Sequence, residues 1–146
     1  MTVPDPLILH ATAVAVNGRA LLIRGASGAG KSGLALEMMA RGAQLVADDR
    51  VVLTLAAGAL WASPPALLAG MIEARFLGLL RVDHLPRAEV VAVLDLDTPE
   101  TERLPPHREI VLQTRNLPLL HNAAHPYFPA ALVQYLKGAT RDPRDG

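Results

Sequence analysis

The stretch that decides the fold is Gly25-Ala26-Ser27-Gly28-Ala29-Gly30-Lys31-Ser32, which fits the phosphate-loop pattern G-x-x-x-x-G-K-S/T at every fixed position. Its glycines leave the backbone bare, so that main-chain N–H groups can approach the oxygens of a phosphate group. Lys31 adds a positive charge, and Ser32 supplies a hydroxyl suited to a magnesium ion. We therefore expect this loop to bind the phosphates of a nucleotide.

The flanking sequence supports this interpretation. Residues 20–23 are a short apolar run that predicts a buried strand ending at the loop. Behind the loop, apolar residues recur at helical spacing over 34–39, and Gly42 is placed to end the helix. A helix that begins at the loop points its free N–H groups and positive dipole end at a bound anion. The alternative, a Gly-rich turn between unrelated elements, is disfavoured because strand, loop and helix follow one another as a phosphate loop requires.

Composition excludes several classes of protein. The chain has 146 residues, which suits a single domain over residues 1–140 followed by a disordered tail over 141–146. Fourteen basic and 14 acidic residues cancel and only 3% are aromatic, which argues against a nucleic-acid partner. No apolar run approaches the roughly 20 residues of a membrane span, and the N-terminus lacks the basic region of a secretory signal. The absence of cysteine is compatible with the reducing cytoplasm, where we expect this protein.

The N-terminal segment predicts a hairpin. Residues 7–16 alternate loosely between apolar and polar side chains and lead into Asn17-Gly18, the strongest short hairpin signal. We expect two antiparallel strands before the phosphate loop, with His10 at the start of the first. From its position, His10 can be either an ordinary strand-end histidine or a catalytic group.

Two adjacent carboxylates follow the next apolar run. Residues 44–47 predict a buried strand that ends in Asp48-Asp49, and ligands bind at the carboxyl ends of strands in open α/β sheets. Neighbouring strand side chains point to opposite faces, so we expect two different roles. One carboxylate could accept a proton from a substrate hydroxyl, and the other could position a metal or a cation. A polar turn is the alternative, and Asp95, which follows another apolar run, is a rival for the same role.

Two further segments carry charged residues that could reach the site. Within residues 70–78, Glu73 and Arg75 share one face if the backbone is extended. The carboxylate could complete a magnesium shell and the guanidinium could hold phosphate, although a surface ion pair is equally natural. Residues 99–107 form a polar, proline-bearing loop with Arg103, which could reach over a site or lie on the surface.

These elements predict a single α/β domain. We expect a mixed, twisted β-sheet with the phosphate loop at the carboxyl end of one strand and helices that flank the sheet. The remaining expected elements are strands over residues 51–55, 60–62, 89–97 and 109–113 and a helix over residues 129–137.

Taken together, the motifs resemble the catalytic domain of the HPr serine kinase/phosphorylase family. His10, the G-x-S-G-x-G-K-S loop and residues 41–51, which fit R-G-x-x-L-V-A-D-D-x-V, follow one another at this family's intervals. Residues 73–78 are similar to its E-I-R-G-L-G signature, and residues 102–104 to its D-R-L. Phe76 replaces the glycine of that signature, so we expect less backbone freedom there.

The resemblance implies a P-loop-containing fold related to phosphoenolpyruvate carboxykinase. It also implies an ATP-dependent, magnesium-requiring kinase that phosphorylates a seryl hydroxyl on the phosphocarrier protein HPr and regulates sugar or nitrogen phosphotransferase signalling. Residues 1–140 would be the catalytic domain, without the N-terminal domain of full-length members. The reverse phosphorylase activity and the formation of a homo-oligomer are left open.

The resemblance also assigns roles to individual residues. The catalytic residues would be His10, Lys31, Asp48, Asp49 and Arg103, with the aspartate pair supplying the general base. The nucleotide-binding residues would be Gly25, Ala26, Ser27, Gly28, Ala29, Gly30, Lys31 and Ser32. The magnesium ligands would be Ser32 and Glu73.

Two other functions remain open. The first is a module that binds a nucleotide as a regulatory ligand with vestigial catalysis, and the second is a P-loop kinase for another hydroxyl substrate. One observation argues against the regulatory module. Two adjacent carboxylates beside a phosphate site weaken anion binding, and they are useful there only if they bind a metal or transfer a proton. A substrate test is needed to separate the second from a protein kinase.

Overall fold

A computed structural model describes residues 4–139 of the chain, and the predicted tail over 141–146 lies outside them. The strands of the main sheet are β1 (Leu7–Leu9), β2 (Thr12–Val16), β3 (Arg19–Arg24), β4 (Gln44–Ala47), β5 (Val51–Ala56), β6 (Ala59–Ser63), β9 (Ala88–Pro99), β10 (Glu109–Leu112) and β11 (Arg115–Asn122). A separate hairpin consists of β7 (Met71–Ala74) and β8 (Gly78–Arg81). The helices are α1 (Lys31–Met39) and α2 (Phe128–Gln134), with a 3-10 turn η1 (Ala66–Leu68) and a π-turn η2 (Tyr135–Ala139). The predicted α/β fold with a mixed sheet and flanking helices is confirmed.

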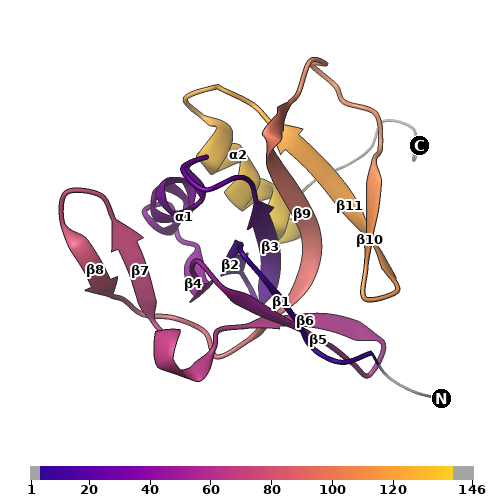
Figure 1. The fold of residues 1–146 in the computed structure, drawn as a ribbon. Helices are drawn as coiled ribbons and strands as arrows, with labels where there is room; N and C mark the ends of the chain where they lie inside the picture. Colours follow the sequence, from indigo (N-terminus) through magenta and orange to yellow (C-terminus); the bar gives the residue numbers. More distant parts are fainter. Residues whose placement is uncertain (1–3, 140–146) are drawn as a thin grey trace.

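The main sheet is organised around β9. Its strand order is β1-β5-β6-β9-β3-β2-β4, and β11 adds β10 as a further branch (Figure 1). One edge of β9 pairs in parallel with β3, up to Arg24 opposite Asp95. Along the other edge, β6 pairs antiparallel with the first residues of β9 and β11 pairs in parallel with its last ones. Because β3 and β9 run in parallel, their carboxyl ends, and the loops that follow them, lie on the same side of the sheet.

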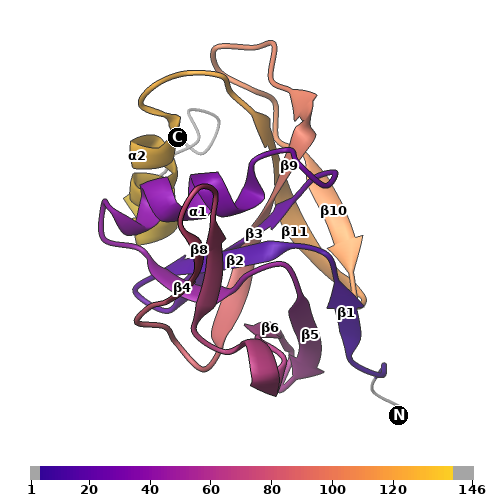
Figure 2. The same cartoon turned by 60° about the vertical axis from the view of Figure 1, so that its left-hand side comes forward.

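Alternating side chains divide the core between the two faces of the sheet. Leu22 and Val93 point to one face, where they pack with buried residues of β5, β6, β10 and β11. Leu21 and Leu94 point to the other face, where they pack with helix residues such as Met38. This period of two follows from strand geometry, and it explains why α1 and α2 cover only one face (Figure 2).

The N-terminal hairpin differs from the prediction in one respect. The turn at Asn17-Gly18 is confirmed, with β2 and β3 pairing antiparallel around it. Residues 7–16, however, are not one strand, because β1 pairs with β5 whereas β2 pairs with β3 and β4. His10 therefore lies at the bend between β1 and β2 rather than at the start of the first strand.

Other predicted elements agree in type and differ in extent. The C-terminal helix begins at Phe128, next to Pro129, and its turns continue to Ala139. Residues 70–78 are not one extended segment, because the chain reverses between β7 and β8. No helix within residues 4–139 is long and apolar enough to cross a lipid bilayer.

Candidate active site

The phosphate loop connects the end of β3 to the start of α1, as the sequence predicts. Gly30 is the N-cap residue and has a φ of 100°, a left-handed conformation that other residues rarely adopt. The first turn of α1 carries neither a capping side chain nor an acidic residue. The N–H groups at this helix end are thus available to an anionic ligand.

The entry of the loop is braced by contacts within the protein. The Ala26 N–H donates to both carboxylate oxygens of Asp97, at 2.9 and 3.1 Å. The Lys31 Nζ donates to the carbonyl oxygens of Gly25 (2.7 Å) and Ala26 (3.1 Å). A Cβ atom at Gly25 would lie 3.1 Å from the Cβ of Leu96, so a larger residue would crowd β9. The loop is therefore held in shape before any ligand binds.

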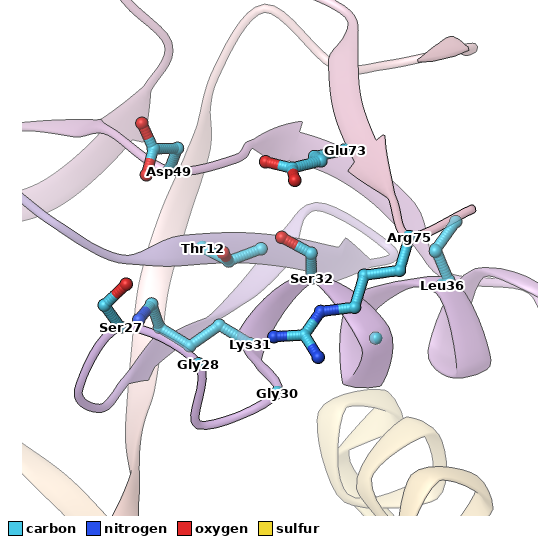
Figure 3. Close-up of a pocket in the computed structure, with 11 residues that line it drawn as sticks. Thr12, Ser27, Gly28, Gly30, Lys31, Ser32, Leu36, Asp49, Glu73 and Arg75 are labelled. Carbon is cyan, nitrogen blue, oxygen red and sulfur yellow. The ribbon is translucent and has the colours of Figure 1, made fainter. Parts of the chain in front are cut away.

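A pocket of about 410 Å³ lies over the loop (Figure 3). We call it the phosphate-loop pocket, and it is lined by Thr12, Ser27, Gly28, Gly30, Lys31, Ser32, Gly33, Leu36, Asp49, Glu73 and Arg75. Its volume falls in the range of roughly 300–1,000 Å³ found for small-molecule sites. Seven of the predicted site residues are among these, namely Ser27, Gly28, Gly30, Lys31, Ser32, Asp49 and Glu73.

Asp48 is the buried member of the aspartate pair, with only 5% of its surface exposed. Its Oδ1 accepts hydrogen bonds from the hydroxyls of Thr12 (2.8 Å) and Ser32 (2.7 Å). Its Oδ2 accepts one from the backbone N–H of Glu73, at 3.1 Å. One carboxylate thereby joins β2, the start of α1 and β7, and holds Ser32 and Glu73 next to each other.

Asp49 is the open member of the pair. It has a φ of 68°, and the N–H of Arg50 donates to the carbonyl oxygen of Asp48 at 2.8 Å, which closes a three-residue γ-turn around Asp49. The turn separates the two carboxylates, so that the Asp49 side chain is 71% exposed and lines the phosphate-loop pocket. Aspartate tolerates positive φ better than most residues do, although the conformation still costs free energy.

His10 lies beside Asp49. Its Nδ1 is 4.0 Å from Oδ1 of Asp49, and its Nε2 is 2.9 Å from the guanidinium of Arg50. A guanidinium can only donate, so Nε2 is the acceptor. The proton of the neutral ring is then on Nδ1, which faces the Asp49 carboxylate.

Glu73 and Arg75 both come from the β7–β8 hairpin and line the phosphate-loop pocket from above the loop. The Arg75 guanidinium reaches toward the loop (Figure 3), where it lies 4.0 Å from the position a Cβ would take at Gly28. Phe76, at the tip of the hairpin, has a φ of 73° and so keeps the left-handed conformation typical of glycine.

The donor set of the pocket fits a magnesium ion. Ser32, Asp49 and Glu73 offer a hydroxyl and two carboxylates around one cavity, and hard oxygen ligands are those that Mg²⁺ prefers. Within the described part of the chain, no three His, Asp or Glu side chains converge to hold a metal on their own. Magnesium fits such an incomplete set because it takes its remaining ligands from water and from phosphate.

Two predicted candidates lie apart from this pocket. Asp95, the rival of the aspartate pair, accepts hydrogen bonds from Thr98 Oγ1 (2.7 Å) and the Asp97 N–H (2.9 Å) and does not contact Ser32. The Thr98 hydroxyl is the main reason why the pKa of Asp95 is lowered. Arg103 is exposed on the loop between β9 and β10, at the same edge of the sheet as the phosphate loop, and its predicted role stays a prediction.

Sequence reasoning missed two residues that shape the site. Thr12 is a fully buried polar residue in β2 that binds Asp48, and Asp97 binds the loop entry. The signal for Thr12 was present, since a lone polar residue in a buried strand needs a hydrogen-bond partner. Asp97 carried no such signal, because its contact depends on β9 lying next to β3.

Comparison with known proteins identifies the family. The family model described as HPr Serine kinase C-terminal domain matches residues 4–93, which is more than half of the chain. The chain belongs to this family. It is 44% identical over 90 residues to the HPr kinase/phosphorylase of Clostridium tetani, covering 62% of this chain and 29% of that protein. It is 43% identical over 84 residues to that of Streptococcus thermophilus, covering 57% of this chain and 27% of the relative. The aligned part thus spans less than a third of these relatives.

A solved structure shares the fold. The Hpr(Ser) kinase/phosphatase from Coxiella burnetii superposes with a TM-score of 0.78, covering 91% of this chain and 90% of the other. The two sequences are 24% identical, so this similarity is a statement about the fold. It extends beyond residue 93, where the family match ends, into the C-terminal third of the chain.

Proposed function

We propose that this HPr kinase-family chain is an ATP-dependent, magnesium-requiring serine kinase domain whose acceptor is an HPr-type phosphocarrier protein. In that role it would regulate sugar or nitrogen phosphotransferase signalling in the cytoplasm. The observation that carries the proposal is the open carboxylate of Asp49, held in a strained turn beside an intact phosphate loop.

The shape of the phosphate-loop pocket supports an orientation for ATP. Asp49 and Ser27 lie at one end of the pocket and Leu36 lies at the other, and the Arg75 side chain extends from the Leu36 side toward the loop (Figure 3). The apolar Leu36 suits the nucleoside end, and the bare backbone at the start of α1 suits the phosphates. The terminal phosphate then lies toward Asp49, with the charge of Lys31 next to it.

The contrast between the two aspartates supports a division of roles. Asp48 already accepts three hydrogen bonds, so it acts as a positioning residue for Ser32 and Glu73. Asp49 is free to accept the proton of an incoming hydroxyl. The hydroxyl oxygen would bond to the terminal phosphorus, the bond from that phosphorus to the bridging oxygen would break, and ADP would leave. His10 would hold the Asp49 carboxylate through its Nδ1–H.

Ser32 and Glu73 would hold the magnesium ion, which when bound neutralises charge on the phosphates. Two acidic side chains beside a phosphate site would weaken a module that only binds nucleotide. The turn at Asp49 adds a cost of about 1–3 kcal/mol that such a module would have no reason to keep. Both observations favour an enzyme over a regulatory binding module.

The direct test is phosphate transfer from γ-labelled ATP to purified HPr by the full chain, with and without magnesium. We expect magnesium-dependent label in HPr as alkali-labile phosphoserine, and no transfer by Lys31→Ala because the loop loses its cation. Label on a small hydroxyl compound but not on HPr would favour the alternative kinase. ATP binding without transfer to any acceptor would favour the regulatory module.

The two aspartates give the first prediction. Asp49→Asn should lower transfer by about 100-fold or more, the usual scale of general-base loss, with ATP affinity changed by less than about tenfold. Asp48→Asn is the matched control, because an amide cannot accept all three hydrogen bonds; it should lower the free energy of unfolding by about 1–3 kcal/mol. Normal transfer by Asp49→Asn would contradict the assignment.

A further inference from the structure

A second pocket lies against the opposite side of the loop entry. It has a volume of about 460 Å³, and we call it the flanking pocket. It is lined by His10, Arg24, Gly25, Ala26, Val93, Asp95, Asp97, Ile110 and Leu119. The phosphate-loop pocket uses residues from Ser27 onward, whereas the flanking pocket uses Gly25 and Ala26. The two pockets therefore share one loop but no lining residue.

The flanking pocket combines apolar and charged surfaces. Val93 is buried and Ile110 and Leu119 are partly buried, and together they form an apolar floor. Two carboxylates, Asp95 and Asp97, face one guanidinium, Arg24, so the pocket is negative overall. The hydrogen bond from Thr98 lowers the pKa of Asp95, which favours the ionised form of that carboxyl. Such a pocket disfavours a free phosphate ion.

The position of the flanking pocket relates it to the acceptor. His10 lines it, and His10 Nδ1 is 4.0 Å from the Asp49 carboxylate that lines the phosphate-loop pocket. In phosphoryl transfer, the attacking and leaving oxygens lie roughly in line on opposite sides of the phosphorus. If the nucleoside lies at the Leu36 end of the phosphate-loop pocket, the acceptor hydroxyl must approach from the opposite end. That end is lined by Asp49, and His10 beside Asp49 also lines the flanking pocket.

We propose that the flanking pocket holds the side chain next to the acceptor serine in a polypeptide substrate, and that it prefers a basic side chain with an apolar stem. This inference rests on the proposed function and specifies its acceptor. Methylene groups of lysine or arginine can lie on the apolar floor while the charged end reaches the carboxylates. A side chain with a negative end would meet two like charges.

The test uses serine pentapeptides that differ only in the residue next to the serine, which is lysine, norleucine or glutamate. Norleucine keeps the stem of lysine without its charge. Binding to the full, methyl-labelled chain is followed by NMR through the methyl groups of Val93, Ile110 and Leu119. Leu136, which packs in the core on the other face of the sheet, is the reference. We expect the lysine peptide to shift the three pocket methyls and to bind about fivefold tighter than the glutamate peptide, with norleucine between them.

Charge variants make the test specific. Asp95→Asn should reduce the advantage of the lysine peptide by about threefold, and Arg24→Gln should increase it, because the two changes move the charge of the pocket in opposite directions. Glu89→Gln is the matched control, since Glu89 is an exposed carboxylate on β9 outside the pocket and should change nothing. In the transfer assay, Asp95→Asn should raise KM for HPr and leave KM for ATP unchanged.

Separate outcomes overturn the two proposals. The pocket assignment is wrong if the glutamate peptide binds best, if inorganic phosphate moves the same methyls, or if the methyls and KM for HPr are both unaffected. If the Asp95 and Arg24 variants transfer phosphate to HPr as well as the unsubstituted chain does, the kinase proposal stands and the pocket assignment is wrong. Lysine-dependent shifts without transfer to HPr would overturn the proposed function, and would leave the flanking pocket as a site for a basic side chain with no link to an acceptor serine.

Discussion

At the scale of residues, the aspartate pair shows how one turn gives two neighbouring aspartates different surroundings. The sequence predicts different roles because side chains alternate along a strand. The two side chains do differ in environment. The cause is not strand alternation, because β4 ends at Ala47 and the γ-turn at Asp49 separates the two carboxylates. Asp48 is enclosed by donors and Asp49 faces the pocket.

This turn leads to a prediction about stability. Asp49→Gly should raise the free energy of unfolding by about 0.5–1 kcal/mol, because relief of the positive φ outweighs the extra backbone entropy of glycine. The same variant should lose transfer, since it removes the carboxylate. Denaturant unfolding checks the first effect and the HPr assay the second. A less stable Asp49→Gly chain would show that the turn is not strained.

At the scale of elements, the β7–β8 hairpin carries Glu73 near the end of β7, one pair before the turn, and Phe76 in the turn itself. The Leu77 N–H donates to the Ala74 carbonyl at 3.1 Å, so Phe76 occupies the turn position that usually needs glycine. We predict that Phe76→Gly raises the thermal midpoint and leaves transfer within about twofold, because Glu73 stays bound to Asp48. Leu77→Gly, at a position without positive φ, should lower the midpoint. Equal effects of the two variants would contradict this account.

The loop between β9 and β10 is closed by an ion pair. Arg108 donates to both carboxylate oxygens of Glu100, at 2.6 and 3.3 Å, and this hydrogen bonding is the main cause of the lowered pKa of Glu100. A lowered folded-state pKa means that the ionised form stabilises the fold at neutral pH, and that this contribution disappears as the pH falls through the folded-state value.

Glu100→Gln should therefore lower stability at neutral pH, with the difference from the unsubstituted chain vanishing in acid. Urea unfolding over a pH series measures this difference. Glu102→Gln on the same loop is the control, because Glu102 is exposed and only its backbone N–H is bonded, to Glu100. A stability difference that persists below the folded-state pKa would indicate lost packing rather than lost charge.

At the scale of the whole molecule, nucleotide binding should stabilise the entire domain. The phosphate-loop pocket draws residues from β2, the loop, α1, the turn at Asp49 and the β7–β8 hairpin. With magnesium and free ATP at about 100 times Kd, the free energy of unfolding should rise by about 2.7 kcal/mol, or roughly 5–10 °C in Tm. Thermal unfolding should show no such rise for Lys31→Ala and a full rise for Arg103→Ala, whose side chain lines neither pocket.

The local parts of this architecture were predictable from the sequence. The phosphate loop has fixed residue types because its backbone must approach a ligand, and the strands and helix beside it follow from apolar periodicity. The match of residues 4–93 to the family agrees with where these motifs lie. The structure shows where the predicted catalytic and magnesium-binding side chains lie. Their roles stay predictions, for Lys31, Ser32, Glu73 and the two aspartates alike.

The non-local parts were not predictable. The break at His10 depends on β1 crossing to β5, and the position of Asp97 depends on β9 lying between β3 and β11. The flanking pocket combines Arg24 of β3 with residues of β9, β10 and β11, which follow much later in the chain. None of these contacts leaves a periodic or motif signal, because each depends on strand pairing over long sequence distances.

The separate attachment of the β7–β8 hairpin has an evolutionary consequence. Its first strand is tied to Asp48 through the Glu73 N–H, whereas Phe76 in the turn is fully exposed, and the hairpin lies outside the main sheet. Selection for chemistry would act on Glu73 and Arg75, which line the phosphate-loop pocket, and would leave Phe76 free to drift. Descendants of a common ancestor can therefore differ at the exposed turn position of Phe76 while inheriting the same pocket residues on either side of it.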